Sequence, residues 1–560
     1  MDRRVISAIV LMMAIAMLPA VIFKRPPRPP VTVDSASVAT QVPPPPPVMA
    51  EAAPAPALSD SVQAEPARTV EVSSPLFTYA ISTRGARFAS ATLHNYRSMV
   101  PADAGADAEL LSPESDLLGL RLVAGADTVS LRDWDFVPSA ESLTADADTP
   151  LTMTASRGGM TVEIRYGFRP DNYLVTVDGR ITGVGPNGGT LLIGMGPGIR
   201  NTEVDSVDHM RNLAVVTKSD ESKRTDLGGL ERDGPTDLSG PFEWVAVKSK
   251  YFVAAVFAVD TVSSGRSSGR IAGVRVMPSD SRKRPAEADV EATLPVPAAG
   301  GFRYTLYAGP MEYPRLRGMG HDFYDVNPYG WPGFRTIIRP VAVAARWLLV
   351  KMHDMGIAYG LALIIFGIMI RVVLWPLNQK AMRASMQMQV IQPILKDMQE
   401  RYKDDPAKLQ QEMFKVYKEY KVNPLGGCWP MLLPMPVLFA LFFVFQNTIE
   451  LRGAPFLWIT DLSRADPLFI IPVLMGLSMY LVSKIGQLGM EPNPQMKIML
   501  YMMPVMMTVL FLKFASGLNL YYAVQNLASI PQQWLLAKER MRKNPGKPVA
   551  AGKGKPGSKR

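Results

Sequence analysis

The 560-residue sequence contains a single cysteine, Cys428, and only four histidines, which lie far apart. One thiol excludes an intramolecular disulfide, and neither residue type is frequent enough for a Cys-based or His-rich metal site. The chain also lacks a P-loop, an HExxH motif and a nucleophile elbow. We therefore expect no metal, no cofactor and no enzymatic activity, and we look for a binding function.

Long apolar runs are plentiful, and the first occupies residues 5–23. At about 1.5 Å per residue it spans roughly 28 Å, close to one hydrocarbon core. It exceeds the usual apolar region of a signal peptide, and Lys24-Arg25-Pro26 follows in place of a small-residue cleavage site. We predict an uncleaved anchor at 1–23, with a cleaved signal peptide as the alternative. In both cases the following chain is exported.

The exported part begins with a proline-rich linker at 24–70, which favours polyproline II and cannot bury a core. Residues 71–315 are predicted to form a β-sandwich. Several strand patterns support this: alternation at 162–168 and at 302–306, and a continuous apolar run at 251–259. Turn signals occur at Asp178-Gly179 and at 186–189. The more polar segment 201–240 is expected to be a long loop or an insertion.

Residues 316–356 connect this domain to the apolar half of the chain. Within them, 333–355 is a basic amphipathic segment with Trp347, interrupted early by Pro340. Such a helix suits a membrane interface, although an ordinary linker helix packed on the β domain is the alternative. The apolar half, 357–536, contains five further candidate spans: 357–377, 428–448, 467–485, 497–514 and 517–536. With the anchor this makes six, so both termini lie on one side of the membrane.

Basic residues decide which side that is. The loop 378–427 and the tail 537–560 are rich in Lys and Arg, whereas the loop 449–466 contains only Arg452 and Arg464. By the positive-inside rule, both termini and the 378–427 loop are cytoplasmic, and residues 24–356 are outside. Two apolar stripes at helical spacing in that loop predict a helical hairpin. Its charged face fits a solvated spacer, ribosomal RNA or a targeting partner equally well.

Acidic residues are missing from all six predicted spans, which makes one arginine conspicuous. Arg371 lies about six residues from the cytoplasmic end of the 357–377 span, hence roughly 9 Å deep. It either snorkels to the interface or faces a wet cavity, because a charge inside a membrane is costly. No acidic residue of the predicted spans can pair with Arg371. The more specific hypothesis is therefore that a client supplies a transient partner for its charge.

The last predicted span carries a polar stripe along one helical face. Its members are Asn519, Tyr522, Asn526, Ser529 and Gln533, spaced by three and four residues. A polar stripe in a membrane faces other helices or water, so it either joins helices or lines a hydrophilic groove with Arg371. Methionines crowd the 497–514 span, and Met435 precedes Pro436 in the 428–448 span; flexible Met side chains suit varied apolar partners.

At this point the residues resemble those of the YidC-type membrane protein insertases of Gram-negative bacteria, which have a large periplasmic domain. The motifs that carry the resemblance are Arg371 with Trp375-Pro376-Leu377, Gln392-Pro393, Tyr402, Asp404-Asp405, Gln411-Glu412-Met413, Tyr417, Val422-Asn423-Pro424-Leu425-Gly426-Gly427-Cys428-Trp429-Pro430, Met435-Pro436, Asn519-Leu520-Tyr521-Tyr522, Asn526 and Gln532-Gln533. They cover about 335–540. Ser82-Thr83-Arg84-Gly85 links the exported domain to the family more weakly. Pro434 and Gly367 depart from the polar residues that some relatives carry.

The resemblance implies an inner-membrane insertase and chaperone that handles nascent membrane proteins, alone or with the Sec translocon. Arg371 would draw a client's hydrophilic tail into an inner-leaflet groove, and Met435, Pro436 and Tyr522 would contact the client. Ribosome contact through the hairpin and the tail is a further expectation. The rival functions are a channel or transporter, which predicts paired broken helices, and a membrane-bound enzyme, which needs a constellation of acids or nucleophiles. Neither pattern is visible.

Overall fold

A computed structural model describes residues 67–543 apart from short gaps. The gaps are 147, 231–233, 259–269, 280–286, 332, 377, 380–390, 392–393, 396, 404, 421–434 and 490–493. The predicted anchor at 1–23, nearly all of the linker, Cys428, Pro434 and the end of the basic tail therefore lie outside the described residues.

The first part of the described chain is β-rich. Its strands are β1 (Thr69–Ser73), β2 (Phe77–Ser82), β3 (Phe88–Arg97), β4 (Asp107–Glu109), β5 (Leu120–Ala124), β6 (Asp127–Ser130), β7 (Val137–Pro138), β8 (Ser142–Thr144), β9 (Leu151–Arg157), β10 (Met160–Phe168), β11 (Leu174–Thr182), β12 (Gly189–Gly194), β13 (Ala214–Lys218), β14 (Ser222–Asp226), β15 (Thr236–Phe242), β16 (Trp244–Lys248), β17 (Phe252–Ala258), β18 (Ile271–Pro278), β19 (Ala288–Val296) and β20 (Gly301–Pro310). Helix α2 (Ser206–Asn212) and the 3₁₀ turn η1 (Leu227–Gly229) interrupt them.

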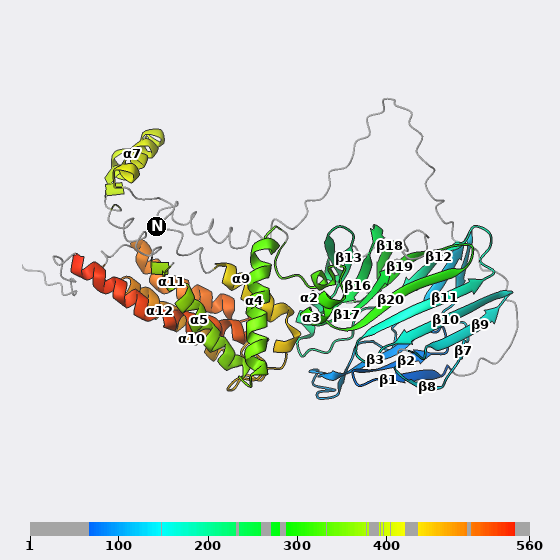
Figure 1. The fold of residues 1–560 in the computed structure, drawn as a ribbon. Helices are drawn as coiled ribbons and strands as arrows, with labels where there is room; N and C mark the ends of the chain where they lie inside the picture. Colours follow the sequence, from blue (N-terminus) through cyan, green and yellow to red (C-terminus); the bar gives the residue numbers. More distant parts are fainter. Residues whose placement is uncertain are drawn as a thin grey trace, which may run out of the picture. The chain divides into compact units, whose positions relative to one another are not determined.

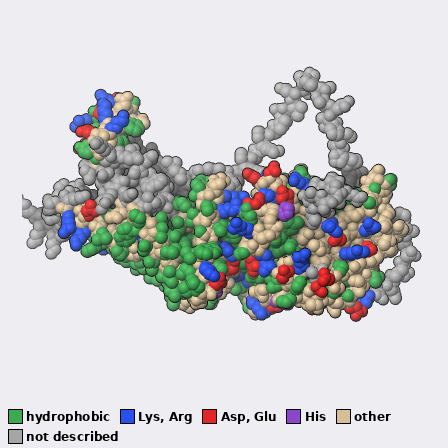
Figure 2. All heavy atoms as spheres, viewed as in Figure 1, with side chains coloured by type: hydrophobic (Ala, Val, Ile, Leu, Met, Phe, Trp, Pro, Cys, Tyr) green, Lys and Arg blue, Asp and Glu red, His purple; other side chains and the backbone are tan. Residues whose placement is uncertain are grey.

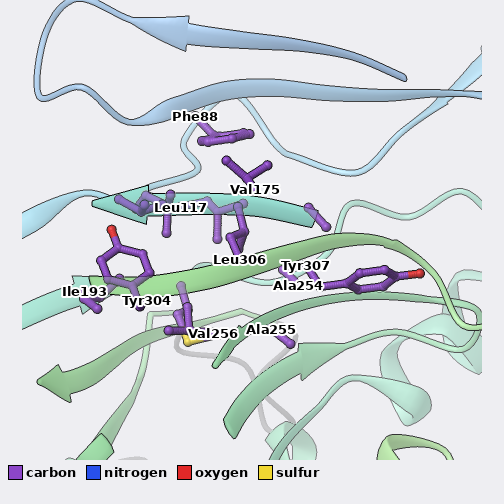
Figure 3. Packing of buried hydrophobic residues seen from close by; sticks show 14 of the residues in the cluster. Phe88, Leu117, Val175, Ile193, Ala254, Ala255, Val256, Tyr304, Leu306 and Tyr307 are labelled. Atoms are coloured by element: carbon purple, nitrogen blue, oxygen red, sulfur yellow. The ribbon is translucent and has the colours of Figure 1, made fainter. Parts of the chain in front are cut away.

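The strands form three sheets in the described residues. Their orders are β4-β3-β2-β1-β8, β14-β13-β16-β17-β20-β11-β10-β9-β7 and β15-β18-β19-β12-β5-β6. One hydrophobic core lies among them (Figure 3), to which the sheets contribute Phe88, Leu306 and Ile193 respectively. The predicted β-rich domain is therefore present, with three sheets in place of the two of a simple sandwich.

The alternating patterns are found in the strands that they predicted. In β10, Val162, Ile164, Tyr166 and Phe168 are all buried, as period-2 alternation requires. The continuous apolar run corresponds to β17, which is buried along nearly its whole length between β16 and β20. A strand inside a large sheet with both faces covered reads as an unbroken apolar run, and this explains the pattern.

Two local predictions were wrong. Asp178-Gly179 does not turn the chain but lies inside β11, where Asp178 pairs with Arg303 of β20. A Cβ on Gly179 would lie 2.0 Å from the ring of Phe302, so this glycine admits an aromatic ring from the next strand. The polar segment 201–240 is likewise not simply a loop, because it contains α2 and β13, and β13 is buried at every position.

Helices make up the second part of the described chain. They are α3 (Tyr313–Gly318), α4 (Arg335–Asp354), α5 (Tyr359–Val373), α7 (Pro406–Glu419), α9 (Met435–Asn447), α10 (Ile470–Gly486), α11 (Pro494–Phe511) and α12 (Ser516–Lys543), with 3₁₀ turns η3 (Phe323–Val326) and η5 (Ile449–Leu451). Helix α4 continues through Pro340, so the predicted early interruption is wrong. Helix α12 extends past residue 536 into the segment predicted to be a tail.

Helices α5, α9, α10, α11 and α12 coincide with the five predicted spans of the apolar half. Helix α12 packs against α10 and α5 and touches α9, and α11 packs on α10 (Figure 1). Within the described ranges, no helix combines the length and the apolar character needed to cross a membrane. The six spans and their orientation therefore stay predictions.

The helices nevertheless carry a large exposed apolar surface. On the face shown in Figure 2, hydrophobic side chains gather over the helices, whereas charged side chains are spread over the β-rich domain. Exposed residues of this kind include Ile368 and Val372 of α5, Leu477 of α10 and Met502 and Val509 of α11. Contiguous apolar surface of this sort is typical of a face that meets lipid or another protein.

The predicted helical hairpin is supported where it is described. Ile391 and Leu395 of the first stripe and Val416 of α7 are buried together, with Met413 and Tyr417 packed on them. Asp405 caps α7 by accepting from the backbone N–H of Lys408 at 3.0 Å.

The segment after α9 joins the helices to the β-rich domain. Ile449 lies in the core of that domain. Arg452 donates from Nε to Glu203 Oε1 at 2.8 Å, and also to the carbonyl oxygens of Arg97 and Thr202 at 2.8 and 2.9 Å. The side chain of Arg452 is only 4% exposed. This arginine is therefore buried where the helices meet the β-rich domain.

Candidate functional site

Arg371 lies in the last turn of α5, a helix otherwise built from apolar residues, glycines and one tyrosine. Its Nη2 donates a hydrogen bond to Oε1 of Gln532 in α12, with 2.8 Å between the two atoms. Nε2 of Gln532 donates in turn to the carbonyl oxygen of Trp375 at 3.1 Å. Gln532 is 1% exposed, so a single buried amide holds both the guanidinium and the backbone that follows α5.

Close packing of α5 on α12 brings these side chains together. A Cβ placed on Gly367, one turn before Arg371, would lie 3.1 Å from Cγ1 of Val524 and 3.5 Å from Cδ2 of Tyr521. A larger residue at this point would require the side chain of Val524 to shift. Gly367 therefore allows close contact between the two helices.

Tyr521, Val524 and Gln532 of α12 contact α5 or the residues that follow it, and Gln525 lies one turn after Tyr521. Nε2 of Gln525 donates to the hydroxyl of Tyr521 at 2.9 Å. The ring of Tyr521 also lies near that of Phe366, with centroids 6.0 Å apart.

The five residues of the predicted stripe lie on a different face, and four of them contact α10 or α11. Nδ2 of Asn519 donates to the carbonyl of Phe511 at 3.0 Å, and the ring of Tyr522 packs edge-on against Phe511. Nδ2 of Asn526 donates to Oγ of Ser478 at 3.0 Å. Gln533 lies beside Gly486, and Ser529 Oγ donates to the carbonyl of Asn526 at 2.6 Å.

The structure therefore separates two features that the sequence placed in one groove. Arg371 donates a hydrogen bond to Gln532, whereas the polar stripe joins α12 to α10 and α11. One residue step turns a helix by about 100°, so Gln532 and its neighbour Gln533 point in clearly different directions. Sequence reasoning missed Gln532 as a site residue, although its helical spacing from Tyr521 was available as a signal.

The guanidinium of Arg371 retains hydrogen-bonding capacity. Its Nε is buried and has no acceptor among the residues that the structure describes. Within those residues no carboxylate forms an ion pair with it, and Gln532 carries no charge. Such a site can bind a carboxylate or a polar backbone segment, because charge-assisted hydrogen bonds to arginine are strong and directional.

The other predicted client-contacting residues lie at accessible positions. Met435 and Pro436 begin the described part of α9, and both side chains are half-buried. Met499, Met502 and Met506 of α11 are exposed and fall on one helical face. These methionines offer a deformable apolar surface.

Two protein-family models match the chain. One, described as "60Kd inner membrane protein", matches residues 350–544, and the other, described as "YidC periplasmic domain", matches residues 69–343. The boundary between the two matches falls inside α4.

Proteins named "Membrane protein insertase YidC" match nearly the whole chain. The one from Chlorobaculum tepidum is 31% identical over 531 residues, covering 88% of this chain and 86% of the relative. Those from Syntrophus aciditrophicus and Nitratidesulfovibrio vulgaris are 30% and 32% identical and cover 96% and 87% of this chain.

Among solved structures, an active YidC insertase with its first transmembrane domain resolved matches with a TM-score of 0.34 at 16% identity, covering 84% of this chain and 95% of that one. A galactose mutarotase-like protein from Lactobacillus casei matches 43% of this chain with a TM-score of 0.28.

Proposed function

Because the chain belongs to the YidC family of membrane protein insertases, we propose that it inserts hydrophobic segments of client proteins into the inner membrane and assists their folding, alone or beside the Sec translocon. The observation that carries the proposal is the contact between Arg371 and Gln532. A buried neutral amide orients the arginine and leaves its positive charge uncompensated.

The electrostatic argument follows from that contact. A cation in an apolar helix is costly, and a carboxylate partner within the chain would remove most of the cost. Gln532 supplies one hydrogen bond and no charge, so the attraction remains available to an incoming group. In this proposal the acidic or polar tail of a client binds Arg371 in the inner leaflet and is then released across the membrane.

The apolar segment of the client follows a separate surface. In our proposal it slides along the exposed apolar residues of α5 and the start of α9, where Met435 and Pro436 contact it. Tyr522, half-buried on α12, belongs to the same client-contacting surface in this proposal, whereas Asn519, Asn526 and Gln533 attach α12 to α11 and α10. Burial of the client's apolar segment in lipid drives the step, and the membrane potential helps acidic tails. No catalytic reaction is proposed.

The proposal includes an orientation and partners. Both termini and the 378–427 hairpin are cytoplasmic, and residues 24–356 are periplasmic, as the distribution of basic residues indicates. Nascent membrane proteins and the lipid bilayer are the primary partners. The basic hairpin and tail suit contact with the ribosome, whose RNA is negatively charged.

The test is insertion of a client with a short acidic exported tail into proteoliposomes that contain the purified full-length protein. We expect Arg371→Ala to lower insertion at least tenfold and Arg371→Lys to retain most of it, because the lysine keeps the charge. Arg464→Ala, which removes an exposed arginine from the 449–466 loop, is the matched control. Normal insertion by Arg371→Ala would refute the role of the arginine.

Photocrosslinking tests the surface for the apolar segment. A crosslinker at position 435 or 522 should capture a ribosome-bound client whose first apolar segment has just emerged. Crosslinks to lipid alone at both positions would contradict this part of the proposal and leave the role of Arg371 standing.

A further inference from the structure

Helix α4 presents an apolar stripe that no described residue covers. Phe334, Ile337, Pro340, Ala344 and Trp347 are all exposed and follow one helical face at spacings of three and four. Trp347 is 63% exposed and Phe334 61%. The opposite face is buried and packs against α9 and α5.

A groove of about 570 Å³ runs beside this stripe. It is lined by Tyr313, Arg317, Tyr324, Arg339, Pro340, Val343, Ala344 and Trp347. The lining is mixed in character: two arginines and two tyrosines come from α3, η3 and α4, and the other four residues are apolar residues of α4. The groove is therefore amphipathic, with cationic, aromatic and apolar parts.

The charges beside the groove are largely paired, and Arg317 adds one positive charge beyond these pairs. Arg339 pairs with Asp325 at 3.0 Å and stacks over the ring of Tyr324, 4.2 Å from its centroid. The hydroxyl of Tyr324 donates to Asp322 at 2.9 Å, and Asp322 is also paired with Lys218. Arg317 is exposed and adds a further positive charge to the lining.

We propose that this groove binds an anionic phospholipid, with its phosphate at Arg317 and Arg339 and one acyl chain along Val343 and Trp347. A headgroup phosphate matches the positive charge of Arg317 and can accept further hydrogen bonds from Arg339, because arginine forks suit phosphate oxygens. From Arg339 to Trp347 the helix rises by about 12 Å, enough for a glycerol and the first part of an acyl chain. Tryptophan and tyrosine favour the level of lipid headgroups.

This inference rests on the proposed function for one point only, the placement of α4 at the periplasmic membrane surface. The lipid would fasten α4 to that surface at the junction between the β-rich domain and the helices. A free phosphate ion would use the arginines alone and leave the apolar part empty, so the two ligands can be distinguished.

The test is native mass spectrometry of the full-length protein in detergent, with added phosphatidylglycerol or phosphatidylcholine. We expect phosphatidylglycerol adducts to exceed phosphatidylcholine adducts at least fivefold. Arg317→Gln should reduce that preference severalfold and Arg317→Gln/Arg339→Gln should abolish it. Arg317 has an exposed side chain on α3, so the single variant tests the site without disturbing the pair with Asp325. The matched control is Arg157→Gln/Arg180→Gln, which removes two exposed arginines from the β-rich domain.

The outcomes separate this site from the function of Arg371. Equal adducts of both lipids, or an unchanged preference in both groove variants, would overturn the lipid site. Full displacement of phosphatidylglycerol by millimolar inorganic phosphate would show a phosphate site only and would also overturn it. Arg371→Ala should keep the lipid preference while losing insertion, so the failure of one idea does not imply the failure of the other.

Discussion

Replacing Gln532 by glutamate tests whether the uncompensated charge of Arg371 is what attracts a client. Glutamate has nearly the same shape as glutamine, so the new carboxylate can still accept the hydrogen bond from Nη2 of Arg371. It loses the donor that satisfies the carbonyl of Trp375, which costs about 1–3 kcal/mol. The protein should fold, with Arg371 now neutralised from within.

The magnitude follows from the geometry of the pair. Two unit charges about 4 Å apart attract by roughly 4 kcal/mol at an effective dielectric constant near 20. A client carboxylate would have to compete with that attraction, which corresponds to about a thousandfold weaker binding. Desolvation of the new carboxylate offsets part of this, so we expect at least a tenfold lower rate of insertion.

The assay compares two clients in proteoliposomes: one with aspartates in its exported tail, and one with asparagines at the same positions. Gln532→Glu should slow the acidic client and spare the neutral one. Gln487→Glu adds the same charge after the end of α10 and serves as the control. Wild-type insertion of the acidic client by Gln532→Glu, together with loss of insertion in Arg371→Ala, would refute the attraction and leave only a structural role for the arginine.

Two further predictions concern the β-rich domain and its junction. Burial lowers the pKa of His209 from its usual 6.5 to about 4, so its stabilising neutral form is complete above pH 6.5 and is lost as the pH falls towards 4, at a cost of up to about 3 kcal/mol. The protection factors of the β13 amides, which correct for the pH dependence of intrinsic exchange, should therefore fall between pH 7 and 5 in the full chain. His209→Phe should remove that fall, and an identical fall in the variant would contradict the prediction. For the pair of Arg452 and Glu203, each alanine variant should destabilise the junction by about 3–5 kcal/mol, since each leaves a buried partner uncompensated. In thermal unfolding the double variant should cost clearly less than the sum of the single variants, and strict additivity would show that the pair is not coupled.

Much of the architecture could be predicted from local patterns. Period-2 alternation located β10 and β20, and apolar runs located α5, α10 and α11, because these signals depend on which face or segment is buried. The predictions failed where the structure that the local sequence favours differs from the one that packing in the folded protein requires. Asp178-Gly179 has the composition of a turn, yet the ring of Phe302 needs the space that Gly179 leaves. Residues 201–240 contain many polar residues, yet β13 is buried among its neighbours.

The sequence by itself indicated the family and the division into a β-rich part and an apolar helical part, and it singled out Arg371, since a charge within an apolar run stands out without any structure. Only the tertiary structure decided what Arg371 contacts. Gln532 and Gln533 are adjacent and chemically identical, and helical spacing placed Gln533, not Gln532, in the stripe expected to line a groove with Arg371. The packing of α12 between α5 and α10 gives them different neighbours, because a step of one residue carries a side chain about a quarter of the way round the helix.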